Sequence, residues 1–514
     1  MARERDQPVI YHGRHVVTLD PGHGPLLDRA GVLVRDGLVL EIGPVDALRR
    51  RHPGAREVGG TDRVVVPGLV DAHQHGRALT TSAHGIDDQP LETWLLDQRD
   101  RPQPDPFLAA RIAGIRLLLS GVTTAAHPHI APQTSDFADH TVATARGLAS
   151  AGLRVSFGID VKDRGSFTYD DDAELLSALP RAAAVAIAGA PNATAPRIDQ
   201  LDALFQYLED ALDGSLVDVA VAPRGPQWCS PDALAWVAER ARRGSHVHVH
   251  CAETRAQYGY FALRGSSPVR HLHAAGLLGP NVTLAHAVWL DAHDVRLIAE
   301  TGAQLSHNPS SNLRLGSGIA PVAHLRRHGV QPALGSDSTG TTSDSIDLFA
   351  EARLARHLET LTRAPGDPGT LDEDSPLARL GEFMRAGRSA TGRTEIVGRL
   401  TVGGPADLVL LDWDRVTAGT VPAVVESEPA WVIGARAGAE HVTDVVVAGE
   451  PLVAEGRYLL ADLVELETEL TEQIVALARP SERSSLAGAL RPYVAARTAE
   501  LAASAVGPFV SNAS

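Results

Sequence analysis

Pro67-Gly68-Leu69-Val70-Asp71-Ala72-His73-Gln74-His75 places two imidazoles two residues apart at the end of an apolar run. Side chains two residues apart on an extended strand point in the same direction, so His73 and His75 can bind one ion together. The stretch therefore predicts part of a metal site at the end of a buried strand.

Three further candidate ligands, His250, His286 and Asp337, each stand at the end of a later apolar run. The parallel strands of a (β/α)₈ barrel all deliver their carboxyl-terminal residues to one mouth, where functional groups collect. We therefore predict an α/β fold with a (β/α)₈ TIM barrel, and a metal site at the carboxyl ends of its strands.

The central part of the chain alternates short apolar runs with helical stretches, which is the pattern of a parallel sheet closed on itself. The runs that we interpret as barrel strands are residues 64–71, 123–127, 154–160, 217–222, 246–250, 282–287, 303–307 and 330–337. Of the three histidines in the fifth run, His246 and His248 lie deeper in the barrel than His250, and we interpret both as structural.

Both ends of the chain have a β-rich texture with frequent glycines, and Arg35-Asp36-Gly37 is a hairpin signal between two apolar runs. We predict one small β-sandwich domain assembled from the two flanks. The expected division is residues 1–66 and 397–460 for this domain, 67–396 for the barrel and 461–514 for a helical tail. The tail is expected to break at Pro480 and to pack on the barrel or on a second subunit.

The acidic composition argues against two classes of binding partner. A net charge of −16 and a pI near 5.7 argue against nucleic acid or an anionic membrane, because either would select a basic surface. The first residues lack the apolar core of a signal peptide, and no apolar run is long enough to span a bilayer. We therefore expect a soluble cytoplasmic protein, and the charge says little about a small substrate.

Six motifs in order resemble those of the amidohydrolase superfamily, specifically the branch that holds cytosine deaminase, guanine deaminase, S-adenosylhomocysteine deaminase and the s-triazine hydrolases. The motifs are Pro67 to His75 as quoted above, Ser120-Gly121-Val122-Thr123-Thr124, His248-Val249-His250-Cys251-Ala252-Glu253-Thr254, Leu284-Ala285-His286-Ala287-Val288, Ser306-His307-Asn308-Pro309-Ser310-Ser311-Asn312-Leu313-Arg314-Leu315-Gly316-Ser317-Gly318 and Leu334-Gly335-Ser336-Asp337. The resemblance covers most of the chain. It implies an aminohydrolase that removes an exocyclic amine from a nitrogen heterocycle such as a purine, pterin, pyrimidine or triazine.

The resemblance also implies roles for individual residues. One divalent cation, Zn²⁺ or Fe²⁺, would be bound by four side chains: His73, His75, His250 and Asp337. Such a cation lowers the pKa of a bound water from 15.7 to about 7, and Asp337 beside that water can accept its proton. Glu253 resembles the acid/base residue, a task worth about 10² to 10⁴ in rate. His286 resembles the histidine that contacts the attacking water or the carbonyl-like oxygen. Relatives commonly form dimers or tetramers, which implies a homodimer or homotetramer.

The substrate pocket is expected at the barrel mouth. His127 and His129 end the second strand, and Arg224 follows the fourth, so all three should open onto the mouth. Arg224 stands where S-adenosylhomocysteine deaminases tend to have a histidine. Its guanidinium suits a carboxylate or carbonyl of a substrate, or it pairs with a neighbouring acid of the chain. Trp94 and Trp289 are candidates to line or cover the pocket.

Three alternatives stay open at this point. Hydantoinases and dihydroorotases open cyclic amides with two ions bridged by a carboxylated lysine on the fourth strand, but Lys162, the only lysine of this chain, lies just beyond the third. The same activated water could instead displace chloride from a triazine-type ring. A non-catalytic scaffold is disfavoured by the complete set of ligands. Metal content separates a scaffold with no tightly bound ion from enzymes with one or two ions per chain.

Overall fold

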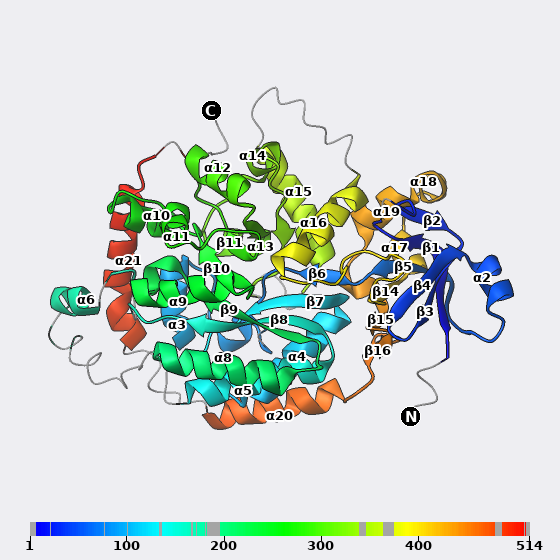
Figure 1. Cartoon of the computed structure of the whole chain (residues 1–514), viewed down its shortest axis with the longest axis horizontal. Helices are drawn as coiled ribbons and strands as arrows, with labels where there is room; N and C mark the ends of the chain where they lie inside the picture. Colours follow the sequence, from blue (N-terminus) through cyan, green and yellow to red (C-terminus); the bar gives the residue numbers. More distant parts are fainter. Residues whose placement is uncertain are drawn as a thin grey trace.

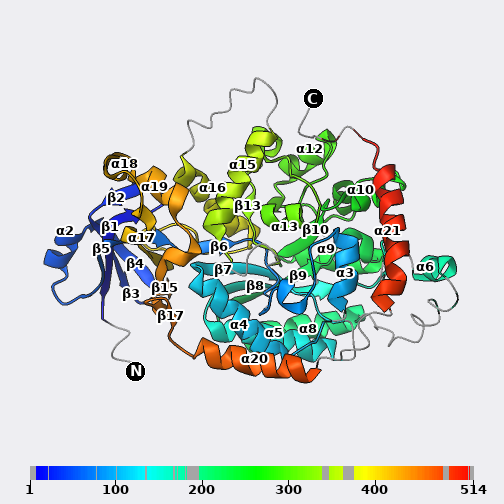
Figure 2. The same ribbon diagram turned by 180° about the vertical axis from the view of Figure 1, so that it is seen from behind.

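Two β-sheets organise the chain in the computed structural model, an eight-stranded parallel barrel and a nine-stranded sheet at one end of the molecule (Figures 1 and 2). The structure describes residues 7–20, 22–76, 78–99, 101–132, 136–165, 168–170, 172–179, 181, 184, 196–338, 346–362, 375–477, 486–507 and 509.

The barrel strands follow one another in space in the order of the sequence. They are β6 (Leu69–Asp71), β7 (Val122–Pro128), β8 (Arg154–Val161), β9 (Val217–Pro223), β10 (Val247–Cys251), β11 (Val282–His286), β12 (Gln304–His307) and β13 (Ala333–Leu334). A hydrogen bond of 2.8 Å from the Ala72 amide to the Leu334 carbonyl joins the first strand to the last. The predicted TIM barrel and its eight strands are thereby confirmed.

The first strand is shorter than predicted. Residues 64–67 belong to β5 (Arg56–Pro67) of the other sheet, where Val64 to Pro67 pair with β14 (Leu408–Asp412). The apolar run is continuous in sequence, but the chain passes from one sheet to the other at Pro67-Gly68. Gly68 is needed at this transition, because a Cβ there would lie 2.0 Å from Thr123 Oγ1. Likewise, only Ala333 and Leu334 of the expected eighth run form a strand.

Helices surround the barrel, and one of them, α6, lies apart from it at the end of the molecule away from the nine-stranded sheet (Figures 1 and 2). They are α3 (Leu91–Arg99), α4 (Pro106–Leu119), α5 (Phe137–Ala151), α6 (Asp172–Ala178), α8 (Ile198–Leu212), α9 (Pro231–Arg242), α10 (Arg255–Ala262), α11 (Pro268–Ala274), α12 (Ala292–Thr301), α13 (Pro309–Arg314), α14 (Val322–Arg327), α15 (Leu348–Leu361) and α16 (Pro376–Ala390), with the 3₁₀ turns η1 (Ser82–His84) and η2 (Pro226–Trp228). Their ends follow local chemistry: Asp105 caps α4 by accepting from the Leu108 amide at 2.8 Å, and Ser230 caps α9 through the Ala233 amide at 3.1 Å.

The second sheet is built from both flanks of the chain, as predicted. Its strands are β1 (Val9–Val17), β2 (Leu26–Asp28), β3 (Ala30–Arg35), β4 (Leu38–Pro44), β5, β14, β15 (Val442–Val447), β16 (Glu450–Ala454) and β17 (Arg457–Tyr458). The β3–β4 hairpin turns at Asp36 and Gly37, which have φ values of 53° and 76°. The short helices α2 (Val45–Arg51), α17 (Trp413–Thr417), α18 (Pro422–Ser427) and α19 (Pro429–Arg436) and the 3₁₀ turn η3 (Ala439–His441) complete this part.

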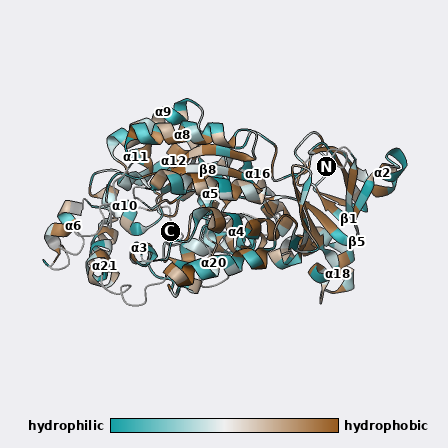
Figure 3. Cartoon of the chain, turned by 90° about the horizontal axis from the view of Figure 1, so that it is seen from below, coloured by the Kyte–Doolittle hydropathy of each residue, from teal (hydrophilic) through white to brown (hydrophobic). Residues whose placement is uncertain are grey.

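The nine-stranded sheet has two buried faces. On one face Val16, Val32 and Leu408 share a small core with neighbouring strands. On the other, Val64 and Val409 join the large core of the barrel. Figure 3 shows apolar residues along β1 and β5, whereas the outer helices have mixed polarity. The sheet is therefore fixed to the barrel by apolar packing.

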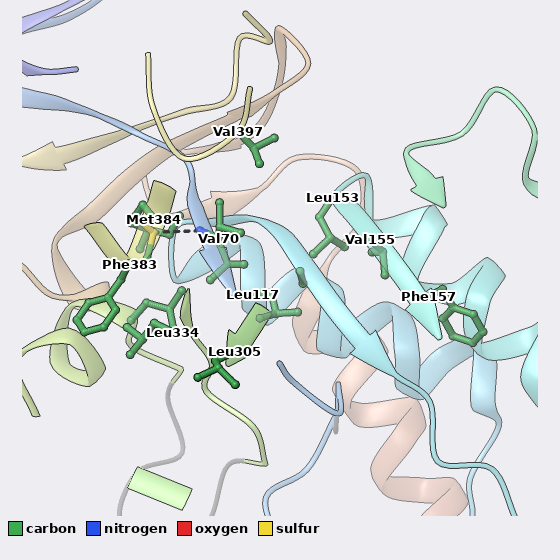
Figure 4. Packing of buried hydrophobic residues seen from close by; sticks show 14 of the residues in the cluster. Val70, Leu117, Leu153, Val155, Phe157, Leu305, Leu334, Phe383, Met384 and Val397 are labelled. Atoms are coloured by element: carbon green, nitrogen blue, oxygen red, sulfur yellow. Dashed lines mark hydrogen bonds between the residues drawn. The ribbon is translucent and has the colours of Figure 1, made fainter. Parts of the chain in front are cut away.

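The barrel core extends under β6. In Figure 4, Met384 of α16 lies against Val70 of β6, and its Sδ accepts a 3.2 Å hydrogen bond from the Val70 amide. Phe383, Leu334 and Leu305 pack nearby, and all are buried. This packing fixes the strand that leads to His73 and His75.

The C-terminal tail packs on the barrel of the same chain. Helix α20 (Leu463–Leu477) lies along α4, where Arg116 pairs with Glu467 at 2.7 Å. Helix α21 (Leu486–Ser504) lies along α3 and α10 (Figure 2). The break expected at Pro480 lies outside the described residues. Among the helices of the described part, none has the length and apolar character needed to cross a membrane.

Candidate active site

Four of the predicted ligands meet at the carboxyl ends of their strands. Nε2 of His75 lies 3.3 Å from Nε2 of His250 and 3.3 Å from Oδ1 of Asp337. The same Asp337 oxygen lies 3.6 Å from Nε2 of His73. These side chains come from the ends of β6, β10 and β13, so the barrel brings together residues up to 264 positions apart in sequence.

His286 lies at the other side of the same cluster. It ends β11, and its Nε2 is 3.8 Å from Oε1 of Glu253 and 4.0 Å from Oδ2 of Asp337. Its Nδ1 lies 2.9 Å from Oδ1 of Asn312, which orients the ring. The structure therefore brings the three predicted acid and base groups, Glu253, His286 and Asp337, to one place.

The backbone around this cluster is strained. Ala252, His286, Ala287 and Asp337 all have positive φ values, between 49° and 76°, although none is glycine. A left-handed conformation costs such residues about 1 to 2 kcal/mol each. At Asp337 the conformation is held by a 2.7 Å hydrogen bond from its amide to the His73 carbonyl. This bond fixes Asp337 opposite the His73–His75 loop.

Asp71 joins the two ligand loops, a role that we did not predict. Its Oδ1 accepts from the amides of His73 at 3.2 Å and Ser336 at 3.0 Å, and its Oδ2 accepts from the Ser336 hydroxyl. The carboxyl is completely buried, and burial raises its pKa to about 7. Asp71 is the last residue of β6, which could have suggested a role at the barrel mouth. Its partner, Ser336, could not be predicted, because it lies 265 residues away in the sequence.

The ligands have hydrogen-bond partners behind them. His75 donates from Nδ1 to the Pro128 carbonyl at 3.0 Å, which leaves a lone pair on Nε2. His73 Nδ1 lies 2.8 Å from His248 Nε2. Ser311 donates to Oδ2 of Asp337 at 2.6 Å. His248 therefore contacts a predicted ligand, which the sequence pattern did not indicate, whereas His246 lies deeper beside the Ala390 carbonyl as expected.

Burial sets the charge states of these groups. It lowers the pKa values of His73 and His250, so both rings stay neutral and keep lone pairs for a cation. Burial opposes ionisation of Asp337, but the neighbouring rings of His73, His75 and His286 hold its pKa well below the usual value. For Glu253, burial raises the pKa to about 7, and the carboxyls of Asp337 and Glu92 act in the same direction.

Beside the cluster lies a cavity of about 130 Å³. His75, His250, Glu253, His286 and Asp337 form part of its wall. The other lining residues are Leu91, Trp94, Leu95, Leu96, Arg99, Ile130, Lys162, Arg224, Trp228, Leu315 and Ser338. The cluster thus opens onto an enclosure large enough for a small heterocycle and lined by both apolar and charged side chains.

Comparison with known proteins places this architecture in a family. Residues 64–452 match the family model described as the amidohydrolase family. This chain belongs to the amidohydrolase family. Residues 30–55 also match an imidazolonepropionase-like composite domain of bacteria.

Curated relatives of this amidohydrolase extend over nearly its whole length. It is 30% identical to a 5-methylthioadenosine/S-adenosylhomocysteine deaminase of Syntrophobacter fumaroxidans over 93% of this chain and 99% of that protein. It is 28% identical to the enzyme of the same name from Moorella thermoacetica over 89% and 97% of the two chains. An 8-oxoguanine deaminase of Pseudomonas aeruginosa is 31% identical over 76% and 83% of the two chains.

Solved structures share the fold. An adenosine deaminase from Xanthomonas campestris with bound zinc has a TM-score of 0.71 at 24% identity, covering 92% of this chain and 99% of that one. The atrazine chlorohydrolase of Arthrobacter aurescens, with zinc and atraton, has a TM-score of 0.74 at 23% identity, covering 91% and 100%.

The donor set of this amidohydrolase can hold a divalent cation. Two groups, His73, His75 and His250, and His73, His286 and Asp337, each place one nitrogen or oxygen atom per residue within 4.8 Å of the others. Nε2 of His73 and Nε2 of His286 are buried and have no hydrogen-bond partner in the described part of the chain. Buried imidazole lone pairs beside an ionised carboxylate suit zinc or ferrous iron.

The five predicted substrate contacts fall into three groups. Trp94 and Arg224 line the cavity beside the cluster. Arg224, however, is held by the chain itself: its Nε donates to Asp160 Oδ1 at 3.2 Å, its Nη2 contacts Asp160 Oδ2, and Nη2 also donates to the Ala131 carbonyl at 3.2 Å. The pairing with a neighbouring acid is therefore the arrangement found.

The other three predicted contacts lie elsewhere. His127 and His129 line a second cavity of about 150 Å³, which shares His75 and Ile130 with the first. Trp289 is turned away from both cavities, because its Nε1 donates to the Ser317 carbonyl at 2.7 Å and its ring packs against Phe509. Of the loop after Asp337, Ser338 lines the first cavity, and residues 339–345 lie outside the described residues.

Proposed function

We propose that this chain is a metal-dependent aminohydrolase with one divalent cation, which hydrolyses an exocyclic amine from a nitrogen heterocycle and releases ammonia or an amine. The observation that carries the proposal is the meeting of four ligand atoms with the buried Glu253 carboxyl at one cavity. The relatives named as deaminases of adenosine derivatives and 8-oxoguanine support this class of reaction.

In this proposal His73, His75, His250 and Asp337 hold the cation, either Zn²⁺ or Fe²⁺. The bound cation would supply an acidified water, whose pKa falls to about 7, and would offset negative charge that develops near it. Asp337 would accept the proton of the water, and the Ser311 hydroxyl orients its carboxylate for this role. His73 and His75 are kept in the required orientation by His248 and the Pro128 carbonyl.

Glu253 and His286 act on the substrate in this scheme. The buried carboxyl of Glu253, with its pKa raised to about 7, carries a proton to a ring nitrogen and then to the departing amine. His286 contacts the oxygen that forms at the reacting carbon. Asn312 holds Nδ1 of the ring, which leaves Nε2 to face this oxygen.

Two alternative chemistries follow from the same residues. A dinuclear cyclic amidase needs a bridging carboxylated lysine on the fourth barrel strand, β9, but Lys162 follows the third, β8. Loss of chloride in place of an amine is favoured only by the fold shared with the atrazine chlorohydrolase. We therefore place the mononuclear aminohydrolase first.

A screen of amino-heterocycles tests the proposal. Purified protein of measured metal content would be incubated with adenosine, 5′-deoxyadenosine, S-adenosylhomocysteine, 8-oxoguanine, pterin, cytosine and aminotriazines, with ammonia as the readout and chloride release from chlorotriazines measured in parallel. Ammonia release that depends on the metal supports the proposal. Turnover of hydantoin or dihydroorotate without ammonia, or chloride release alone, would contradict it.

Two further expectations are proposals of the same kind. We propose that residues 1–66 and 397–460 form one domain, 67–396 the barrel domain and 461–514 a helical extension. We also propose a homodimer or homotetramer, which light scattering of the purified chain would measure directly.

A further inference from the structure

Lys162 is the only lysine in the chain, although the sequence contains 47 lysine and arginine residues in all. The chain uses arginine at every other basic position. The one exception is not on the surface: Lys162 directly follows β8, its exposed fraction is 8%, and it lines the cavity beside the proposed metal ligands.

The barrel separates Lys162 from the proposed reaction centre. The predicted ligands, Glu253 and His286 come from the ends of β6, β10, β11 and β13, whereas β8 lies between β7 and β9, neither of which supplies one of these groups. The proposed ligands and Glu253 therefore line one side of the cavity. The ammonium group of Lys162 lines it from a different part of the barrel.

The surroundings of Lys162 hold its side chain in the cavity wall. Its Nζ lies 4.9 Å from the ring centroid of Trp228, within the range of a cation–π contact, and Trp228 is fixed by a 3.1 Å hydrogen bond from Nε1 to the Thr168 carbonyl.

Basic side chains accumulate on this part of the cavity. Arg99 and Arg224 line the cavity together with Lys162, and Arg224 pairs with Asp160. A lysine ammonium differs from a guanidinium because it is a compact point charge with three rotatable donors. Such a group suits a single anionic oxygen, whereas the planar fork of an arginine suits paired hydrogen bonds to two oxygens.

We infer that Lys162 binds an anionic oxygen of the substrate. The substrate class would then be an amino-heterocycle that carries a carboxylate or a phosphate away from the carbon that loses its amine. The inference rests on the proposed function, since it assigns the orientation of the heterocycle in that same cavity. Lys162 is a specificity-determining residue in this account, and it takes no part in the proton transfers.

The test compares heterocycle pairs that differ by one anionic group: adenosine with adenosine 5′-monophosphate, pterin with pterin-6-carboxylate, and cytosine with 5-carboxycytosine. Binding to the metal-loaded E253Q protein is measured by calorimetry, and kcat/KM of the unsubstituted protein by ammonia release. We expect preference for the anionic member in at least one pair, and the pair that shows it identifies the source of the anionic oxygen.

Lys162→Met should remove that preference by about 10- to 100-fold, the range of a hydrogen bond to a charged group, and leave the neutral member almost unchanged. Lys162→Arg should retain part of it. The matched control is Arg264→Gln, which removes one positive charge from outside the cavity, where Arg264 lies over the Tyr260 ring. Circular dichroism and metal content verify that each variant folds and keeps its ion.

Each outcome bears on one of the two claims. No preference in any pair, or a preference that K162M retains, would overturn the role of Lys162, and ammonia release from neutral members would still uphold the proposed function. A preference lost in K162M without ammonia release from any compound would uphold Lys162 and overturn the aminohydrolase. A carboxylated Lys162, seen as two ions per chain and a 44 Da mass increase lost on acidification, would also overturn the anion-binding role.

Discussion

The Nε2 atoms of His75 and His250 lie 3.3 Å apart, and the His75 ring keeps its proton on Nδ1, where it donates to the Pro128 carbonyl. The lone pair of His75 Nε2 therefore points at the neighbouring imidazole, with the carboxylate of Asp337 at 3.3 Å on the same side. A divalent cation bound by all three groups is the simplest arrangement that makes this proximity favourable. Four consequences of this account can be measured.

Replacing Asp337 with Ala should remove both the cation and the activity, because a carboxylate that contacts two imidazoles is lost from the centre of the ligand set. We expect the metal affinity, measured by competition with a chelator, to fall by at least about 100-fold. Asp414→Ala removes an exposed carboxylate from α17 and serves as control. A D337A protein that binds the ion as tightly as the unsubstituted chain would refute ligation by Asp337.

His248→Ala should weaken metal binding by about 10- to 100-fold, since the ring of His73 loses the partner that lies 2.8 Å from its Nδ1. His307→Ala is the matched control. His307 is equally buried, and in the described part of the chain neither of its ring nitrogens has a hydrogen-bond partner. Equal metal affinities of the two variants would mean that the His73–His248 contact does not orient the ligand.

Glu253→Gln should keep the ion and lose most turnover. Glutamine preserves the size of the side chain but cannot carry the proton, which is worth about 10² to 10⁴ in kcat. The amide of Glu253 donates to Gln257 Oε1 at 2.8 Å, so the backbone position should not change. The measurement is single-turnover ammonia release at equal metal content, and full retained activity would exclude the acid/base role.

Met384→Ala should destabilise the fold by about 2 to 5 kcal/mol, because it opens a cavity beside Val70 and removes the acceptor of the Val70 amide. Met384→Leu keeps the volume, so its loss of apolar packing should cost less than about 1.5 kcal/mol. The Val70 amide, left without its acceptor, adds a separate cost. Chemical denaturation followed by circular dichroism measures both. Equal stabilities of M384A and the unsubstituted chain would show that this contact does not support β6.

The sequence was most informative where burial is uniform. Barrel strands such as β7 and β8 are buried along their whole length. They therefore occur in the sequence as continuous apolar runs, which predict buried strands. The run 64–71 was divided wrongly, because apolar composition does not mark where Pro67-Gly68 passes from one sheet to the other. The domain boundaries themselves stay a prediction.

Within the site, strand ends indicated which residues would converge, and His73, His75, His250 and Asp337 do lie together. Contacts across the barrel could not be predicted. The alternation of side chains along a strand predicts that His248 points into the barrel. It does not predict that His248 contacts the ring of His73, 175 residues away. Trp289 lies beyond the end of β11, where the alternation of a strand no longer fixes the direction of a side chain, and it packs on Phe509 instead.

Elemental analysis of the purified chain tests the central claim most directly. The account predicts about one zinc or iron ion per chain, removed by a strong chelator together with ammonia-releasing activity and restored with it when the same metal is added back. A chain that holds no tightly bound ion and is still active, or one that holds two ions joined by a carboxylated Lys162, would contradict the account.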